Sequence, residues 1–283
     1  MPATSTRRHQ LAAEQFVSVT KASRDDAQAY LRNNNYDIEA AVNQFYSDSA
    51  NGPPNVDQAL EAMFDSLATE TSKDELDMDG TIAYCQALNV DPASYEFFVL
   101  ADIVQVQSFG QITRQGFVKG WKRATTVSPD MDAHQQYVQS QIRLVKTDAA
   151  VFRKVYRSAF VACKEAGKRE LDMGEALTYW EVLFEPTMHG WATANVEWLE
   201  AWKGYLTEKF WVDKGGARKW TRSVSRDLWN QILLFAERTM ADETLGFWSE
   251  DQAWPGLIDE FVVWCKEKGI VKAQNEETME LEE

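Results

Sequence analysis

The sequence predicts an all-α protein made of a small N-terminal bundle and a larger helical domain. Apolar residues recur at helical spacing along most of the chain, and stretches that alternate as a β-strand would are few and short. Residues 47–56 are rich in Ser, Asn, Gly and Pro and interrupt the helical pattern, which is typical of a linker. These observations predict one domain on each side of that linker.

The first domain, predicted for residues 8–46, should contain three helices. Residues 11–19 are apolar at helical spacing and form the first of them. Ser23, with Asp26 three residues later, is an N-cap signal for the second helix. Asp37 is expected to cap the third helix, which is apolar along one face.

The larger domain, predicted for residues 57–272, reads as a series of amphipathic helices followed by an acidic tail at residues 273–283. Helix starts are indicated where a polar capping residue or a Pro precedes an apolar periodic run. The predicted starts lie at Asp91-Pro92, Thr113, Ser128-Pro129, Ser225 and Ser249.

Two tight turns of this domain have the Gly-x-Ile core of a calcium-binding EF-hand loop, at residues 80–82 and 110–112. The last position of such a loop must carry a bidentate Glu, and here it carries Gln86 and Gly116. We therefore expect EF-hand-shaped loops that serve as architecture without calcium, with the two Ile residues paired in a short ladder.

The chain has a formal net charge of −15, and residues 242–283 alone contain twelve acidic residues and three Lys. An acidic surface repels phosphate groups, which argues against nucleic acid and favours a basic protein surface as partner. No run approaches the roughly 18 apolar residues of a membrane span, and the N-terminus lacks the apolar core of a signal peptide. We therefore expect no membrane partner.

Neither a metal site nor a catalytic centre is indicated. The three Cys and three His are scattered too widely along the sequence to predict a metal site. Three separate Cys in apolar helical contexts are typical of buried, reduced thiols in a cytoplasmic or nuclear protein. The sequence has no Gly-rich phosphate loop, nucleophile elbow or HExxH motif. It therefore indicates a binding protein that needs no cofactor.

Four ordered blocks resemble the defective-in-cullin-neddylation family. They are DGTIAYCQALNVDPAS at residues 79–94, LDMGEALTYWEVLF at 171–184, SRDLWNQILLF at 225–235 and DQAWPGLIDEFVVW at 251–264. The resemblance covers about residues 57–271 and implies the family's potentiating-neddylation domain, built from degenerate EF-hand-like units. The first 46 residues resemble a ubiquitin-associated (UBA) domain, although Val19-Thr20-Lys21-Ala22-Ser23 replaces the Gly-Phe or Gly-Tyr loop typical of such domains.

The resemblance implies a non-catalytic scaffold in a ligase. Such a protein binds a cullin and the conjugating enzyme charged with the cullin's ubiquitin-like modifier, and promotes transfer by proximity and orientation. The family's Asp-Ala-Asp patch receives the C-terminal winged-helix region of the cullin and matches Asp227, Ala253 and Asp259. A second site, an apolar pocket for the N-acetylated Met of the conjugating enzyme, matches Ala93, Phe97, Leu100, Ala101, Ile112, Tyr179 and Val182.

The stretch SEDQAWPGLIDEF, residues 249–261, sets a Trp-Pro step among acidic residues. We expect its helix to bury Leu257, Ile258 and Phe261, with Pro255 in the first turn. Trp254 should pack inward, so that Ala253 leaves room for a partner's backbone.

One segment departs from the family's pattern, because extra residues lie around Lys209–Trp220. It carries a basic stretch made of Lys214, Arg218, Lys219 and Arg222. Two alternative functions are also open. The first is a ubiquitin-binding adaptor that acts through residues 8–46. The second is an EF-hand-type calcium regulator, which Gln86 and Gly116 disfavour.

Overall fold

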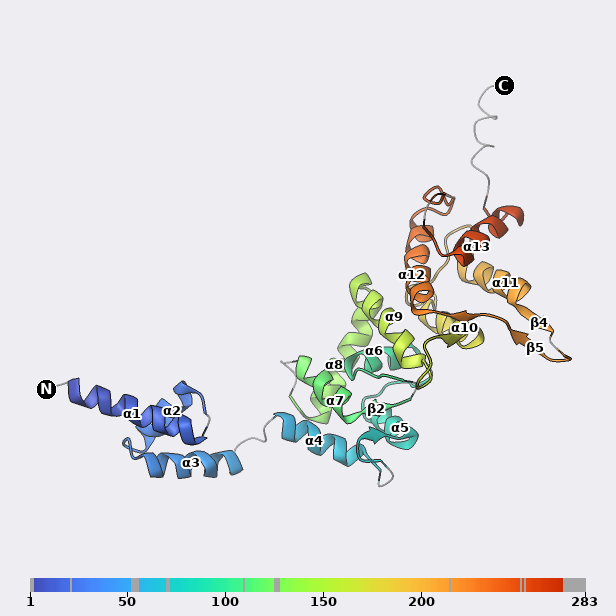
Figure 1. The fold of residues 1–283 in the computed structure, drawn as a ribbon. Coiled ribbons are helices and arrows are strands. Elements are labelled where there is room, and N and C mark those ends of the chain that lie inside the picture. Colours follow the sequence, from blue (N-terminus) through green and yellow to red (C-terminus); the bar gives the residue numbers. More distant parts are fainter. Residues whose placement is uncertain are drawn as a thin grey trace. The chain divides into compact units, whose positions relative to one another are not determined.

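The fold is almost wholly helical, which confirms the predicted class (Figure 1). The computed structural model describes residues 3–20, 22–51, 56–69, 72–108, 110–124, 128–213, 215–249, 251 and 253–271. It divides into two compact units, Met1–Ala59 and Leu60–Glu283. The predicted acidic tail at residues 273–283, Lys21 and Lys214 lie outside the described residues.

The first unit is a three-helix bundle of α1 (Ala3–Thr20), α2 (Arg24–Asn33) and α3 (Ile38–Asn51). The predicted caps are confirmed. Ser23 Oγ accepts a hydrogen bond from the amide of Asp26 at 3.1 Å, and Asp37 Oδ1 accepts one from the amide of Ala40 at 3.1 Å. A separate core holds the helices together and includes Ala12, Phe16, Ala27, Leu31 and Ala41.

Two helices of this unit are longer than predicted. α1 begins at Ala3 rather than at residue 11, and α3 continues to Asn51, inside the predicted linker. In both cases the intervening sequence contains neither Gly nor Pro, so nothing forces the helix to stop. The first breakers after α3 are Gly52 and Pro53, and residues 52–55 lie outside the described residues.

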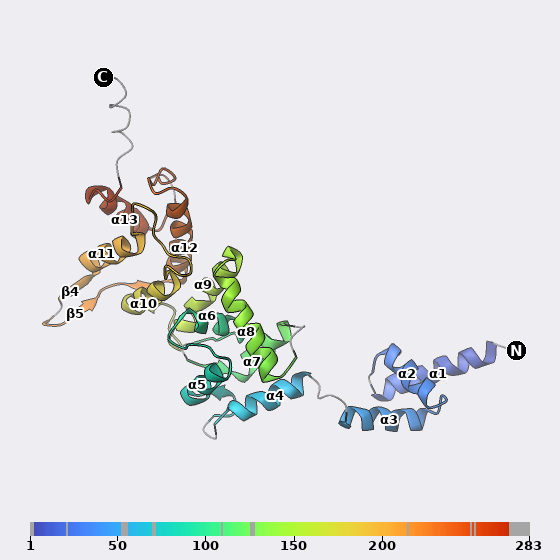
Figure 2. The same cartoon turned by 180° about the vertical axis from the view of Figure 1, so that it is seen from behind.

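The second unit contains ten helices within its described residues, packed around one core (Figure 2). The first six are α4 (Val56–Leu67), α5 (Met78–Ala87), α6 (Tyr95–Ile103), α7 (Arg114–Arg123), α8 (Met131–Val145) and α9 (Ala149–Cys163). The last four are α10 (Met173–Leu183), α11 (Trp198–Phe210), α12 (Arg226–Ala241) and α13 (Gly256–Glu267). None of the described helices is both long and apolar enough to cross a membrane.

Short antiparallel strand pairs join segments that are distant in sequence. β1 (Glu75–Leu76) pairs with β2 (Ile112–Thr113), and β3 (Leu171–Asp172) pairs with β6 (Ser223–Val224). Each of these four strands leads directly into a helix whose N-terminal amides are capped by a side chain. The capping residues are Asp77 for α5, Thr113 for α7, Asp172 for α10 and Ser225 for α12.

Of the two predicted Gly-x-Ile loops, residues 110–112 form a turn that leads into a strand, whereas residues 80–82 lie in a helix, so the predicted ladder between the two Ile residues is wrong. Gly110 has a φ of +70° and Ile112 lies in β2, but its ladder partner is Leu76. Gly80 lies in α5 because its amide donates a 2.8 Å hydrogen bond to Asp77 Oδ1, so this stretch is an N-cap. That Asp-Met-Asp-Gly sequence also resembles a calcium loop, which explains the error. The EF-hand-like character of these units stays a prediction.

Three of the five predicted helix starts are displaced. Thr113 and Ser225 cap their helices as predicted. The helix expected at Asp91-Pro92 begins after Ser94, because the Asp91 carboxylate accepts a 2.9 Å hydrogen bond from the amide of Ala93 and forms a turn first. The other two starts move from Ser128-Pro129 to Met131, capped by Asp130, and from Ser249 to Gly256.

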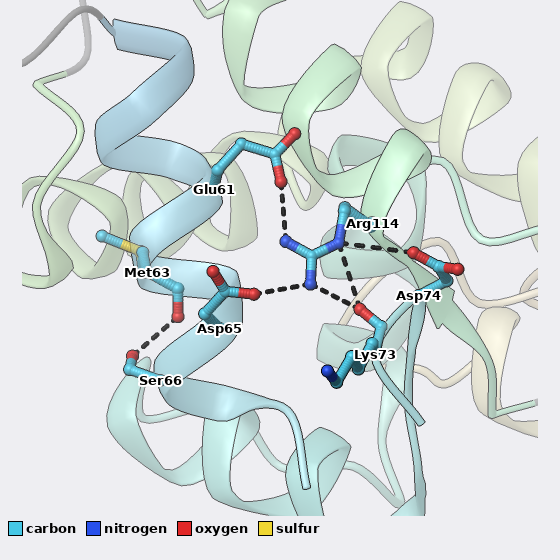
Figure 3. A network of polar contacts seen from close by, with 7 residues as sticks. All are labelled: Glu61, Met63, Asp65, Ser66, Lys73, Asp74 and Arg114. Carbon is cyan, nitrogen blue, oxygen red and sulfur yellow. Dashed lines mark hydrogen bonds and ion pairs between the residues drawn. The ribbon is translucent and has the colours of Figure 1, made fainter. Parts of the chain in front are cut away.

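Arg114, the first residue of α7, fastens α4 to the second unit (Figure 3). Its Nη1 lies 2.6 Å from Glu61 Oε2 and its Nη2 lies 2.6 Å from Asp65 Oδ1. Its Nε also donates to the backbone carbonyl of Lys73 at 3.1 Å. The guanidinium carbon lies 4.6 Å from the centroid of the Phe64 ring, which is buried. The hydrogen bond to Glu61 is the main cause that raises the pKa of Arg114.

We expect Arg114→Leu to lower the free energy of unfolding by about 1–2 kcal/mol, since three ion pairs with exposed carboxylates, those of Glu61, Asp65 and Asp74, and one carbonyl contact are lost. Arg123→Leu is the matched control, because Arg123 is exposed on the same helix and has no ion-pair partner among the described residues. Urea denaturation followed by Trp fluorescence measures both variants. Equal stabilities of the two variants would show that the Arg114 contacts do not hold α4.

Candidate protein-binding sites

The predicted acidic patch comes from two helices and the turn before one of them. Asp227 is the second residue of α12 and is exposed, and no Lys, Arg or His forms an ion pair with it among the described residues. Ala253 is exposed in the turn that leads to α13, and Asp259 is half-buried in the first turn of that helix. Asp227 therefore comes from a different helix than Asp259.

Asp259 is held in place by an indole. Trp248 Nε1 donates a 2.9 Å hydrogen bond to Asp259 Oδ1. The Nζ atom of Lys266 lies 4.4 Å from the centroid of the Trp248 ring, so a cation covers the face of that indole. The Asp259 carboxylate is thus held in one orientation, and it can accept further hydrogen bonds.

A groove of about 390 Å³ adjoins Asp259. Its lining residues are Lys209, Trp248, Asp259, Glu260, Val263, Trp264 and Glu267. Three of these residues are carboxylates, and two are large aromatics that give the groove apolar walls. A groove of this composition suits the aliphatic stem and charged head of a Lys or Arg side chain.

The Trp-Pro step positions this end of α13. Trp254 packs against Phe235 and Phe247, with ring centroids 5.7 and 6.2 Å apart, which confirms that it faces inward. Pro255 directly precedes the first helical residue, one position earlier than predicted. The residue before a Pro is disfavoured in the α conformation, so the helix cannot extend back toward Ser249. The predicted buried face of α13 is confirmed, because its three residues are buried: Leu257, Ile258 and Phe261.

An apolar pocket of about 210 Å³ opens between α5, α6, α9 and α10. Ala93, Phe97, Tyr179 and Val182, all predicted pocket residues, line it together. The other lining residues are Met78, Thr81, Ile82, Pro92, Ser94, Phe98, Gly110, Ala162, Cys163 and Thr178.

The structure places the remaining three predicted residues outside this lining. Leu100, Ala101 and Ile112 are buried in the core of the second unit, at exposures of 0–3%. Sequence reasoning also missed the wall supplied by α5. Met78 and Ile82 are four residues apart, lie on one helical face and are 56% and 37% exposed. Reading residues 78–87 as a helix, rather than as a loop, would have revealed that pair.

The pocket offers an uncharged surface. The Thr178 hydroxyl donates to the carbonyl of Gly174 at 3.2 Å, so its hydrogen atom is directed to the backbone. Burial raises the pKa of the Cys163 thiol, and burial likewise raises the pKa of the Tyr179 hydroxyl. Both groups are therefore neutral at physiological pH. This pocket suits an apolar group without charge, about the size of one large side chain.

The fold and these two surfaces define a helical binding protein with one acidic and one apolar site. A family model described as cullin binding matches residues 133–264, and one described as a UBA-like domain matches residues 12–52. The first match includes Asp227, Ala253 and Asp259.

Several similar proteins have names that refer to cullin neddylation or to DCN1. "Defective in cullin neddylation protein 1" of Pyricularia oryzae is 36% identical, covering 95% of this chain and 96% of the relative. The protein of that name in Yarrowia lipolytica is 28% identical, covering 89% and 94%. "DCN1-like protein 3" of Rattus norvegicus is 30% identical, covering 75% and 63%. The chain belongs to the defective-in-cullin-neddylation family.

Proposed function

We propose that this protein promotes cullin neddylation as a non-catalytic scaffold in a ligase. It binds a cullin at the acidic patch and the charged conjugating enzyme at the apolar pocket. The observation that carries this proposal is the cullin-binding match over residues 133–264, which contains an Asp259 carboxylate already oriented by Trp248. Family membership supports the same function.

The chemistry of the acidic patch favours a basic partner surface. Asp227 is exposed and Asp259 faces a groove with two further carboxylates, so Lys or Arg groups of a cullin winged-helix region would find charge-assisted hydrogen bonds. Ala253, exposed beside the buried side of Trp254, presents only a methyl group and allows a close backbone approach.

The apolar pocket favours a blocked N-terminus. A Met side chain and an acetyl group are both uncharged, whereas a free α-amino group would bring a positive charge into a site with no carboxylate among its described lining residues. We therefore assign the pocket to the N-acetylated Met of the conjugating enzyme.

Simultaneous binding is sufficient for the proposed activity. Holding two weakly associating proteins on one scaffold raises their effective concentration and restricts their relative orientation. Cys163, which lines the apolar pocket, has a pKa raised by burial, so the proposal assigns it no covalent role.

The direct test is a reconstituted transfer reaction. Purified cullin C-terminal region, charged conjugating enzyme and this protein are mixed, and the modified cullin is quantified over time. We expect this protein to raise the initial rate at limiting enzyme concentration, and a pull-down at two salt concentrations should show cullin binding that weakens with salt. An unchanged rate together with no cullin capture would contradict the proposal. Ubiquitin binding by residues 8–46 stays a prediction.

A further inference from the structure

A basic β-hairpin stands out from an otherwise acidic protein. Residues 209–222 contain five basic residues and one acidic residue, a net charge of +4 within a chain of −15. β4 (Trp211–Asp213) and β5 (Arg218–Trp220) form this hairpin as a separate two-stranded antiparallel sheet. Both views show it projecting beyond α10, on the side away from α9 (Figures 1 and 2).

The base of the hairpin is fixed to the second unit. A Cβ atom added at Gly174, in the first turn of α10, would lie 2.8 Å from Trp220 Nε1, so this indole packs directly on the helix backbone. The rings of Trp211 and Trp220 lie 5.0 Å apart across the two strands. The amide of Thr221 donates to the carbonyl of Phe210 at 3.1 Å. The base of the hairpin is therefore packed in a defined position against α10.

Two of its positive charges, those of Arg218 and Lys219, form no ion pair within the described part of the chain. Arg218 and Lys219 are exposed, and neither has a carboxylate partner among the described residues. By contrast, Lys203 on α11 pairs with Glu181 at 2.7 Å. Arg is one of the residue types enriched among the dominant contacts of protein interfaces, and Arg218 is exposed here beside Lys219.

The hairpin adjoins the helix that forms one wall of the apolar pocket. Gly174, which contacts Trp220, lies one turn before Thr178 and about two turns before Val182 on α10. Thr178 and Val182 both line the pocket, so along the helix axis the pocket begins roughly 6–12 Å from the hairpin base. A folded protein whose N-terminus fills the pocket is large enough to reach the hairpin as well.

We propose that this hairpin is a second docking site for the partner that inserts its N-terminus into the apolar pocket, and that it binds an acidic segment of that partner. This inference rests on the proposed function. A protein segment fits better than nucleic acid, because a phosphate backbone would meet few cations here and the repulsion of a chain with a net charge of −15. Carboxylates of a protein can instead be matched locally to Arg218 and Lys219.

The test separates the hairpin from the pocket with two probes. One probe is the acetylated N-terminal peptide of the conjugating enzyme, and the other is the whole acetylated enzyme. Both are titrated by fluorescence anisotropy against the full chain and its double variant Arg218→Glu/Lys219→Glu. We expect equal peptide affinity, but enzyme affinity reduced about fivefold or more in the variant, with the difference shrinking at high salt.

The control is Lys122→Glu/Arg123→Glu, which makes the same change of charge at exposed residues of α7. It should bind both probes like the unmodified chain, and thermal melts should show all three proteins folded. Failure of the peptide to bind the unmodified chain would overturn the pocket assignment itself. If the peptide binds but the enzyme binds all three proteins equally, only the hairpin proposal is overturned. A hairpin variant that instead loses affinity for a 20-base-pair DNA duplex also overturns it.

Discussion

The N-terminal peptide of the conjugating enzyme should bind at least about 100-fold more tightly when its α-amino group is acetylated, a difference on the order of 3 kcal/mol. The described residues that line the pocket include no carboxylate that could pair with an ammonium group. Burying that charge unpaired therefore costs several kcal/mol, whereas an acetyl amide loses much less. Fluorescence anisotropy with labelled peptides of otherwise identical sequence measures both affinities.

The same argument fixes the sign of the pH dependence. A free α-amino group has a pKa near 8 in water, and the pocket favours its neutral form. Affinity for the free peptide should thus rise as the pH increases through about 8, while affinity for the acetylated peptide stays constant over that range. Ala93→Arg should abolish binding of both peptides by filling the pocket, and Leu144→Arg, at a partly exposed site outside the lining, should not. Equal affinities for acetylated and free peptides would contradict the assignment.

Charge reversal in the acidic patch should weaken cullin binding by more than about 2 kcal/mol for Asp227→Lys and for Asp259→Lys. Each change replaces attraction to basic partner groups with repulsion, and Asp259→Lys also removes the acceptor of the Trp248 hydrogen bond. Ala253→Arg should cause a comparable loss through bulk. The losses for the two Asp variants should shrink at high salt much more than the loss for Ala253→Arg, because salt screens charge and leaves steric overlap unchanged.

Two further variants make this measurement decisive. Asp132→Lys, at an exposed position near the start of α8, introduces the same charge change elsewhere and should bind like the unmodified chain. Trp254→Ala should instead lower the free energy of unfolding by roughly 2–4 kcal/mol, since its contacts with Phe235 and Phe247 are lost. Binding is followed by calorimetry and folding by thermal melts. Folded patch variants that stimulate transfer as well as the unmodified chain would show that these Asp residues are only a solvated helix face.

Local signals in the sequence predicted some features well. Ser23, Asp37, Thr113 and Ser225 cap helices as expected, because an N-cap depends on a few adjacent residues. The start of α13 could have been placed correctly too, since the restriction that Pro255 puts on the preceding residue is equally local.

Features that depend on distant packing were harder to predict. Gly80 appeared to be a loop residue, but Leu67 approaches it so closely that an added Cβ atom would lie 2.7 Å from the Leu67 carbonyl oxygen. The pocket shows the same limit. Its wall from Ala162 and Cys163 lies at the end of α9, and no periodicity within one helix reveals which neighbouring helix that end will face.

The position of α4 determines how the protein can be divided. Leu60 and Phe64 of this helix are buried in the core of the second unit, and Arg114 ties the same helix to α7. A cut within residues 52–55 therefore removes the N-terminal bundle while leaving every one of these contacts intact. A cut only ten residues later would remove Leu60 from that core and would remove Glu61, which pairs with Arg114. A chain shortened within residues 52–55 therefore keeps the α4 contacts with the core and with Arg114.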